Sequence, residues 1–364
     1  MGALGRSVLG RSTLIRHVLL LVLGVLVVIV LTGQLSSFHN YELASLGAYI
    51  CAAAGLTVLI GLNGQVSLGH AALMAIGGYT VALLQQRFSD QGVHGLWVLP
   101  VSLLGGVVVT AVAGAVIGVA AARLRGPYLA GATLALGVTL PSITSRFTGL
   151  FKGDQGVFVP ADGPPAGLGA DFALEHWQAW ISLGAALLVL FFLANLNSSA
   201  VGRHMRAVRD DEIAAQLAGL SVARVQILTF TISAAAAGLG GGVFAVALQT
   251  ASPGSFDLTL SLTLLAAIVI GGLGSLTGAV WGSIIVVYLG TLTRNWTDHL
   301  GLSAASAQKL HDNLPNAAFG LLLIVVMLAL PGGIQGFLRR VRGLLHRRNA
   351  PSSRRSTQPT GEPA

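Results

Sequence analysis

Long apolar runs separated by short polar segments repeat along most of the chain. Most of them approach the roughly 20 residues that an α-helix needs to cross a hydrocarbon core about 30 Å thick. The pattern predicts an all-α fold, a polytopic membrane helix bundle of about ten transmembrane helices. The runs are 17–32, 42–62, 67–86, 96–122, 128–145, 178–196, 226–248, 258–270, 278–292 and 314–330.

Two features leave the number of spans open. The runs 258–270 and 278–292 are shorter than a full crossing, so they form either two spans or a broken, re-entrant pair. The first run follows three arginines, as in a signal peptide, but residues 36–39 (Ser-Ser-Phe-His) lack a small-x-small cleavage site. We therefore expect residues 1–40 to form a basic segment and a retained first span.

Composition agrees with a membrane protein. Of the 364 residues, 54% are hydrophobic and only 9% are charged, whereas soluble domains carry about 25% charged residues. The 48 glycines suit close helix packing in a bilayer. The single cysteine, Cys51, lies within an apolar run, which excludes an internal disulfide and favours a packing role. The net charge of +8 does not indicate nucleic-acid binding, because the basic residues flank apolar runs and form no patch with aromatic residues.

The distribution of charge predicts the orientation. Ten crossings put both termini on one side, which then holds three arginines before the first span, two between the fourth and fifth, four at 200–225 and seven in the tail. That side thus carries sixteen of the 21 basic residues, whereas nine of the 13 acidic residues lie opposite or at span ends. The positive-inside rule then makes both termini cytoplasmic and turns the polar loop 147–177 outward. We expect the basic tail, 337–364, to be disordered.

One well-charged segment, 200–222, interrupts the apolar sequence. Asp210 is expected to cap a short helix, because its side chain can accept from free backbone N–H groups of the first turn. Gly219 is expected to end that helix, and Ser221 to cap the next one.

The short helix has an apolar side, formed by Ile213, Leu217 and Leu220 at spacings of four and three. Two interpretations remain open. The segment is either an amphipathic helix offered to a partner outside the membrane, or a solvated loop whose arginines only fix the topology. These arginines are Arg203, Arg206, Arg209 and Arg224.

Polar residues also interrupt the spans at 61–70, where Asn63, Gln65, Ser67 and His70 stand among apolar residues. Irregular backbone at membrane depth is tolerated only where protein or a watery cavity satisfies it. Ser67 is expected to cap the following helix and turn its N-terminus toward the break. The segment is either a gate or pathway element, or a tight turn near the cytoplasmic surface with a histidine packed between helices.

A second interruption, 271–275, consists of Gly271, Gly272, Leu273, Gly274 and Ser275. Close helix packing and a hinge in the pathway are both consistent with three glycines at this place.

The sequence contains no catalytic, cofactor-binding or metal-binding motif. It lacks the GxxxxGK[ST] nucleotide loop, HExxH, CxxC and GxSxG, and its histidines lack ligand spacing. We therefore predict a protein that is not an enzyme and does not hydrolyse ATP itself. The few polar residues within the spans do not form the Asp, Glu or His chain of a proton-driven pump, which disfavours a stand-alone secondary transporter.

Several blocks of sequence, taken in order, resemble the permeases of bacterial branched-chain amino acid ABC importers, in particular the M-type subunit family of the Liv system. The first block reads GLNGQVSLGHAALMAIGGYT, and together the blocks cover most of residues 41–336, the expected permease domain. The blocks are 61–80, 125–137, 202–245, 261–283 and 319–333.

The resemblance implies that segment 200–222 docks on an ATPase subunit and couples ATP binding to alternating access. It implies a second related permease subunit, two ABC ATPase subunits that bind the ATP, an extracytoplasmic binding protein and a bacterial inner-membrane location. If the two interruptions are pathway elements, as one interpretation of each has it, the gate or pathway residues are Asn63, Gln65, Ser67, His70, Gly271, Gly272 and Gly274. The coupling residues would be Arg203, Arg206, Ala207, Asp210, Asp211, Glu212, Ala215 and Gly219.

The same resemblance favours leucine, isoleucine and valine as substrates. Related permeases carry urea or short amides, and a separate binding protein does most of the selecting in such systems. Import of urea or short amides therefore remains the alternative within this class.

Overall fold

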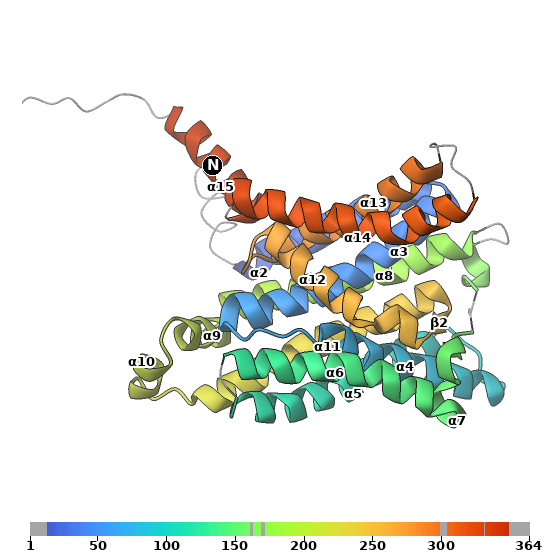
Figure 1. The fold of residues 1–364 in the computed structure, drawn as a ribbon, viewed down its shortest axis with the longest axis horizontal. Coiled ribbons are helices and arrows are strands. Elements are labelled where there is room, and N and C mark those ends of the chain that lie inside the picture. Colours follow the sequence, from blue (N-terminus) through green and yellow to red (C-terminus); the bar gives the residue numbers. More distant parts are fainter. Residues whose placement is uncertain are drawn as a thin grey trace, which may run out of the picture.

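The computed structural model describes residues 13–124, 126–160, 163–168, 172–298, 304–330 and 332–348. Helices dominate these ranges, as the apolar pattern predicts (Figure 1). The long helices are α2 (Thr13–Gln34), α3 (Ser37–Leu56), α4 (His70–Asp90), α5 (Val98–Ala121), α6 (Pro127–Arg146), α8 (Leu174–Ser198), α11 (Val222–Leu248), α12 (Leu258–Gly271), α13 (Leu276–Asp298), α14 (Ala304–Ala329) and α15 (Gly333–Arg348). The shorter elements are η1 (Thr57–Leu62), α7 (Thr148–Phe151), η2 (Gly153–Gln155), β1 (Val157–Phe158), η3 (Ala166–Leu168), α9 (Ala200–Asp210), α10 (Glu212–Leu217), β2 (Thr250–Ala251) and η4 (Pro253–Phe256).

Helix α11 forms the centre of the bundle and packs against α3, α4, α5 and α8. Its glycines explain how the backbones come so close. A methyl group on Gly241 would lie 1.8 Å from the carbonyl oxygen of Met74, and one on Gly77 of α4 would lie 2.2 Å from that of Gly238. Between helices in lipid the hydrophobic effect gives no driving force, so association depends on van der Waals packing, which small residues allow by letting the backbones approach. Cys51 is fully buried in this core, in agreement with a packing role.

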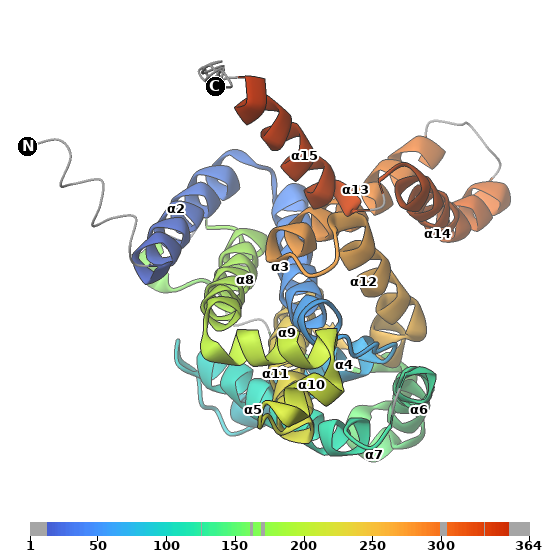
Figure 2. The same cartoon turned by 90° about the vertical axis from the view of Figure 1, so that its left-hand side faces the viewer.

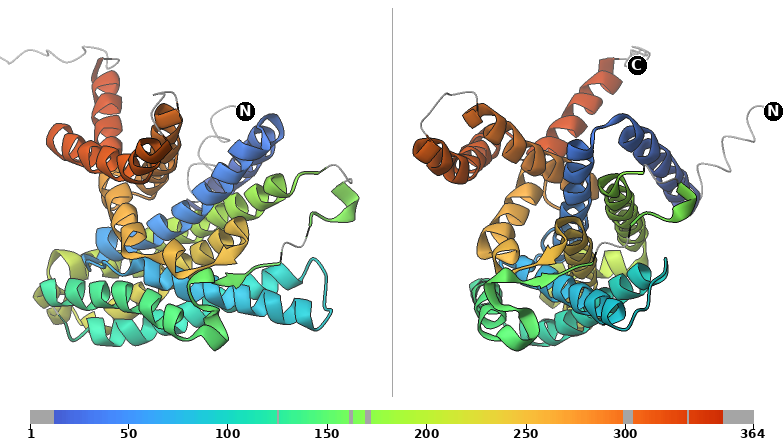
Figure 3. Two further views of the ribbon diagram at one scale, coloured as in Figure 1. Left: turned by 45° about the vertical axis from the view of Figure 1, so that its right-hand side comes forward. Right: turned by 90° about the vertical axis from the view of Figure 1, so that its right-hand side faces the viewer.

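Helices α2 and α14 lie on opposite flanks of the bundle (Figures 2 and 3). Only 6% of the apolar window of α2 is buried, and large side chains such as Leu20, Leu23 and Leu26 are more than half exposed. An exposed, continuously apolar helix surface is what lipid contact requires. The outer helices therefore provide the lipid-facing surface.

Within the described residues, nine helices are long and apolar enough to cross a membrane. The expectation of about ten differs from this number at α4, which is 21 residues long but less apolar than the others. The last two turns of this helix contain Gln85, Gln86 and Arg87, and its Gly- and Ala-rich part is buried against α5 and α11. It faces protein, so its sequence need not be as apolar as that of a lipid-facing span.

The short runs at 258–292 form two helices that pack on each other. Helix α12 has 14 residues, but the preceding η4 turn extends this candidate span to the 19 residues Pro253–Gly271. Helix α13 has 23 residues. The length deficit that left this region open in the sequence is therefore made up by the η4 turn before α12 and by the greater length of α13.

The expectation of a disordered tail from residue 337 is wrong for its first part, because α15 continues to Arg348. Phe337, Leu338 and Val341 recur at helical spacing among arginines, a pattern that favours an amphipathic helix. Residues 349–364 lie outside the described part.

Hydrogen bonds fix which ends of the helices lie together. His17 near the start of α2 bonds to Asn195 near the end of α8 at 2.9 Å, and Trp180 near the start of α8 donates to Thr32 near the end of α2 at 2.8 Å. The start of α2 thus lies at the end of the bundle where α9 and α10 follow α8. The two-stranded sheet of β1 and β2 lies at the opposite end, with α7 (Figure 1).

Candidate functional site

Helices α9 and α10 carry the charged segment and project from one end of the bundle (Figure 1). The predicted cap is off by one residue: Asp210 is the last residue of α9, and Asp211 caps α10. The carboxylate of Asp211 accepts from the backbone N–H of Ile213 at 2.8 Å and of Ala214 at 3.0 Å. Its extended backbone breaks the helix between α9 and α10, which the continuous polar sequence did not indicate.

Helix α10 ends as the sequence predicts. Gly219 adopts a positive φ of 83°, and the N–H of Leu220 returns to the carbonyl of Ala215 at 3.0 Å. Ser221 stands at the N-cap position of α11, but its side chain makes no capping hydrogen bond.

The two faces of α10 differ sharply. Ala215 is buried with Val208 of α9 and Val222 of α11, and holds α10 against its neighbours. Ile213 and Leu217, by contrast, are 72% and 85% exposed. A short helix with two almost fully exposed aliphatic side chains at the tip of the bundle is a surface suited to a protein partner.

The other predicted coupling residues occupy different positions on this segment. Arg206 donates to the backbone and side-chain oxygens of Asn197 at the end of α8. Glu212 accepts from Gln226 of α11 at 3.2 Å. These contacts tie the segment to the bundle. Arg203, Ala207, Asp210, Asp211 and Gly219 are exposed.

Arg209, outside the predicted set, makes the contact that connects this segment to the spans. Its Nη1 donates to the carbonyl oxygen of Gly61 at 2.6 Å, and its Nε and Nη2 pair with Asp210 at 3.0 and 2.8 Å. The alkyl part of the side chain passes over Gly64, where an added methyl group would come within 3.0 Å of it. The end of α9 is thereby bonded to the interruption that follows α3.

The polar residues of this interruption are buried. Between η1 and α4 the backbone is irregular, and Asn63, Gln65, Ser67 and His70 are each at most 5% exposed. The side-chain polar atoms of Asn63, Gln65 and Ser67 have no hydrogen-bond partner within the described residues. Buried polar groups are nearly always paired, so these three side chains are available to water, to a ligand or to a partner subunit.

The expected capping role of Ser67 is wrong. Helix α4 begins at His70 with Gly69 at its N-cap position, Ser67 Oγ makes no hydrogen bond to it, and the hydroxyl of Ser261 in α12 accepts from the N–H of Ala71 at 2.9 Å. The N–H of Leu68 donates to Thr133 of α6 at 3.0 Å. Side chains from two distant helices thus satisfy the backbone here, a solution that no local motif reveals.

The second interruption is a tight turn between α12 and α13. A methyl group on Gly271 would lie 1.8 Å from the carbonyl oxygen of Gly278, so the helices touch through their backbones. Gly272 and Gly274 adopt positive φ values of 114° and 78°. A methyl group on Gly61 would lie 2.4 Å from Gly274 Cα. The two interruptions, far apart in sequence, therefore meet beside Arg209.

A family model described as branched-chain amino acid transport system / permease component matches residues 41–331. The chain is 32% identical over 276 residues to the high-affinity branched-chain amino acid transport system permease protein LivM of Salmonella typhimurium and to that of Escherichia coli K12. It is 26% identical over 310 residues to LivH of Salmonella typhimurium.

The match with the LivM proteins covers 69% of this chain and 62% of their length, so less than two thirds of those relatives is represented. The match with LivH covers 82% of this chain and 94% of the relative. No solved structure matches the chain.

Proposed function

The chain belongs to the family of branched-chain amino acid transport permease components, and on that basis we propose that it forms one transmembrane subunit of an ATP-driven importer for branched-chain amino acids. Its proposed partners are a second related permease subunit, two ABC ATPase subunits and an extracytoplasmic substrate-binding protein. ATP would bind to the ATPase subunits only.

The observation that carries this proposal is the path from an exposed helix to the interrupted spans. Ile213 and Leu217 of α10 offer apolar surface to an ATPase groove, while Arg209, next to α10, holds the carbonyl of Gly61. When the ATPase moves α10, Asp211, which caps α10 and directly follows α9, moves with it and displaces Arg209 near the end of α9. Its charge-assisted hydrogen bond then passes the displacement to the junction of the two interruptions.

We place this end of the bundle in the cytoplasm. The starts of α2 and α15 and the α9–α10 segment lie at this end, and sixteen of the 21 basic residues fall in the segments that join it. Positive residues are retained on the cytoplasmic side of a membrane. Both termini are then cytoplasmic, and the loop between α6 and α8 faces the outside of a bacterial inner membrane.

The first test is a pull-down of the detergent-solubilised protein from its native host, followed by mass spectrometry. Recovery of a second permease and ATPases with a Walker A motif is the expected result, and liposomes containing that complex should import leucine when ATP and the binding protein are supplied. Recovery of this chain alone, with transport that ignores ATP, would refute the proposal and indicate a stand-alone carrier or channel.

A variant tests the docking surface directly. Leu217→Asp places a charge on an 85% exposed side chain, so the fold should survive while the ATPases are lost from the pull-down. Leu150→Asp is the matched control, because Leu150 in α7 is 54% exposed at the opposite end of the bundle. Equal recovery of ATPases with both variants would contradict docking through α10.

A further inference from the structure

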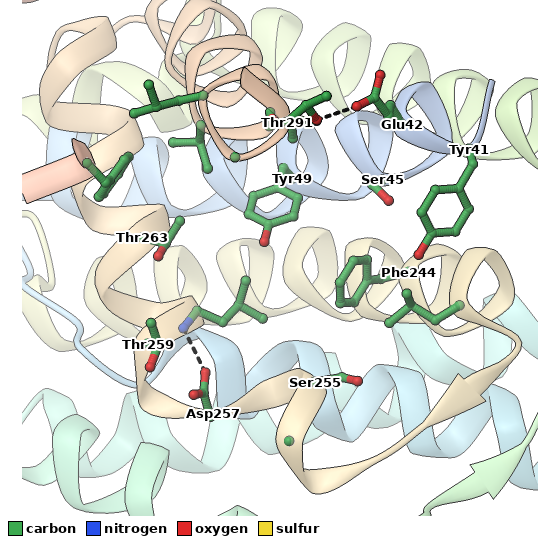
Figure 4. A pocket seen from close by; sticks show the side chains of 18 of the residues that line it. Tyr41, Glu42, Ser45, Tyr49, Phe244, Ser255, Asp257, Thr259, Thr263 and Thr291 are labelled. Atoms are coloured by element: carbon green, nitrogen blue, oxygen red, sulfur yellow. Dashed lines mark hydrogen bonds between the residues drawn. The ribbon is translucent and has the colours of Figure 1, made fainter. Parts of the chain in front are cut away.

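A cavity of about 780 Å³, seen from close by in Figure 4, lies between elements at the end of the bundle away from α9 and α10 (Figure 1). The first turns of α3, the end of α11, the η4 turn, and helices α12, α13 and α14 surround it. Small-molecule sites usually occupy about 300–1,000 Å³ and combine apolar walls with a few polar groups. The cavity has that size and, as its lining shows, that composition.

Three kinds of side chain line the cavity. Aliphatic and aromatic residues such as Leu248, Val287 and Phe244 form apolar walls, and hydroxyl groups of serines, threonines and tyrosines interrupt them. Two carboxylates, Glu42 and Asp257, lie on opposite sides with Tyr49 between them (Figure 4). Among the residues whose side chains the structure describes, no lysine, arginine or histidine lines the cavity. The described lining therefore offers two carboxylates to a positive charge and no cationic side chain to an anion.

Glu42 is the key residue of this site. It is 6% exposed in the second turn of α3 and accepts through Oε1 from the hydroxyl of Thr291 in α13. Its Oε2 has no hydrogen-bond partner within the described residues. An ionisable side chain inside a membrane bundle is expensive and is typically retained for a ligand, an ion or a proton. A buried carboxylate with one free oxygen on a cavity is placed to accept from a cationic group.

We propose that this cavity binds the transported amino acid, with Glu42 as the counter-ion of its ammonium group. The inference rests on the proposed function and extends it to a substrate site. Asp257 adds negative charge from the opposite wall. The substrate carboxylate would accept from a hydroxyl farther from the acidic residues, such as that of Thr263, and its aliphatic side chain would lie on Leu248 and Val287.

The charge of the site also separates the two substrate classes that the sequence leaves open. Urea and short amides carry no charge, so burying them beside Glu42 and Asp257 gains no ionic interaction. An ammonium group would form a charge-assisted hydrogen bond with the buried carboxylate, and this bond would offset the desolvation penalty of Glu42. The site therefore selects amino acids over neutral amides, independently of the binding protein.

Two charge-neutral variants test this assignment without disturbing the walls. In Glu42→Gln the amide oxygen can still accept from Thr291, and in Asp257→Asn the side chain can still cap α12, where Asp257 now accepts from the N–H of Leu260 at 3.0 Å. The matched control is Glu175→Gln, because Glu175 stands in the first turn of α8 and does not line the cavity.

The experiment uses the complete importer in liposomes. At saturating leucine-loaded binding protein, Glu42→Gln should lower ATP-driven leucine uptake at least tenfold, Asp257→Asn should lower it less, and Glu175→Gln should match the wild type. A leucine analogue with a diazirine in its side chain should label peptides that contain Phe244 or Val287. The label should be displaced by leucine and by 3-methylbutylamine but not by 4-methylpentanoate, and Glu42→Gln should abolish it.

The outcomes separate this inference from the proposed function. If the wild-type complex imports leucine, and Glu42→Gln imports and is labelled equally well, the ammonium site is refuted while the importer stands. The site is also refuted if 4-methylpentanoate displaces the label as well as the amine does. If the wild-type complex fails to import any branched-chain amino acid with ATP, the proposed function itself is overturned.

Discussion

The two interruptions of the spans meet in the structure but differ in how their polar groups are satisfied. The turn between α12 and α13 is built from glycines, and its polar side chain is paired: Ser275 bonds to Thr277 and to the N–H of Gly278. The segment between η1 and α4 instead buries Asn63, Gln65 and Ser67 without partners for their side chains within the described residues. Packing explains the first interruption completely and leaves the second one unexplained.

This difference indicates that the segment between η1 and α4 lowers the stability of the isolated bundle. A buried polar group without a partner costs about 1–3 kcal/mol, and several of them stand between η1 and α4. Glycine turns cost little when the helices they join touch each other. We infer that the glycine turn is a fixed support, against which the polar segment and its Arg209 contact can move.

The largest expected effect comes from a side chain at the point where the two interruptions meet. In Gly61→Val the new Cβ would lie 2.4 Å from Gly274 Cα and 2.5 Å from its nitrogen, and backbone atoms cannot move aside as a side chain can. Overpacking of this kind should cost about 3 kcal/mol. The loss is measured as a lower midpoint of thermal unfolding in detergent and a lower yield of monodisperse protein.

Gly131→Val is the matched control, because Gly131 lies on the exposed side of α6 with no atom within 4 Å of an added methyl group. It should change the midpoint little. If both valine variants unfold at the same temperature, the contact between Gly61 and Gly274 is not a rigid support.

A smaller effect is expected from Arg209→Gln. The variant removes the guanidinium that donates to Gly61 but keeps an exposed polar side chain at the end of α9. A coupling free energy of about 1–3 kcal/mol would be lost, so leucine uptake per ATP hydrolysed should fall roughly tenfold while hydrolysis continues. Both rates are measured on the reconstituted importer.

Arg224→Gln removes an exposed arginine of the same charged segment, at the start of α11, and should leave that ratio unchanged. A normal ratio with Arg209→Gln would mean that the Gly61 contact carries no coupling. The polar segment would then need another source of movement.

The sequence predicted the fold well because hydropathy responds to the environment of a whole helix. Runs of about 20 apolar residues have few alternatives to a membrane span. The predicted all-α bundle and permease family are confirmed. The prediction was weakest at α4 and α15. Helix α4 is less apolar than the other spans because it is buried by protein, and α15 was predicted to be disordered because its sequence is rich in basic residues.

The site was predicted only as far as local signals allow. Gly219 was found because a positive φ favours glycine wherever a helix ends. Arg209 was missed because the group it binds, the backbone carbonyl of Gly61, is 148 residues away in the sequence. Every residue has such a carbonyl, so the identity of the partner gives no signal. Nothing in the sequence distinguishes this arginine from its neighbours. Glu42 was missed for a similar reason: the proposed role of its carboxylate depends on a cavity that six elements form together.

The smallest effect sharpens the comparison most, because it separates paired from unpaired polar groups within one segment. Thr133→Val removes the acceptor for the N–H of Leu68 and should destabilise the isolated permease by about 1 kcal/mol. Ser67→Ala removes a 1% exposed hydroxyl that has no partner within the described residues, so it should leave the stability unchanged or raise it slightly. Thermal unfolding in detergent measures both.

The assembled importer should respond in the opposite order. If the hydroxyl of Ser67 is reserved for a partner subunit or for a state that forms during transport, Ser67→Ala should slow leucine uptake more than Thr133→Val does, although it is the more stable variant. Should Ser67→Ala instead destabilise the isolated chain as much as Thr133→Val, its hydroxyl already has a partner within this subunit, and the contrast between the two interruptions would lose its basis.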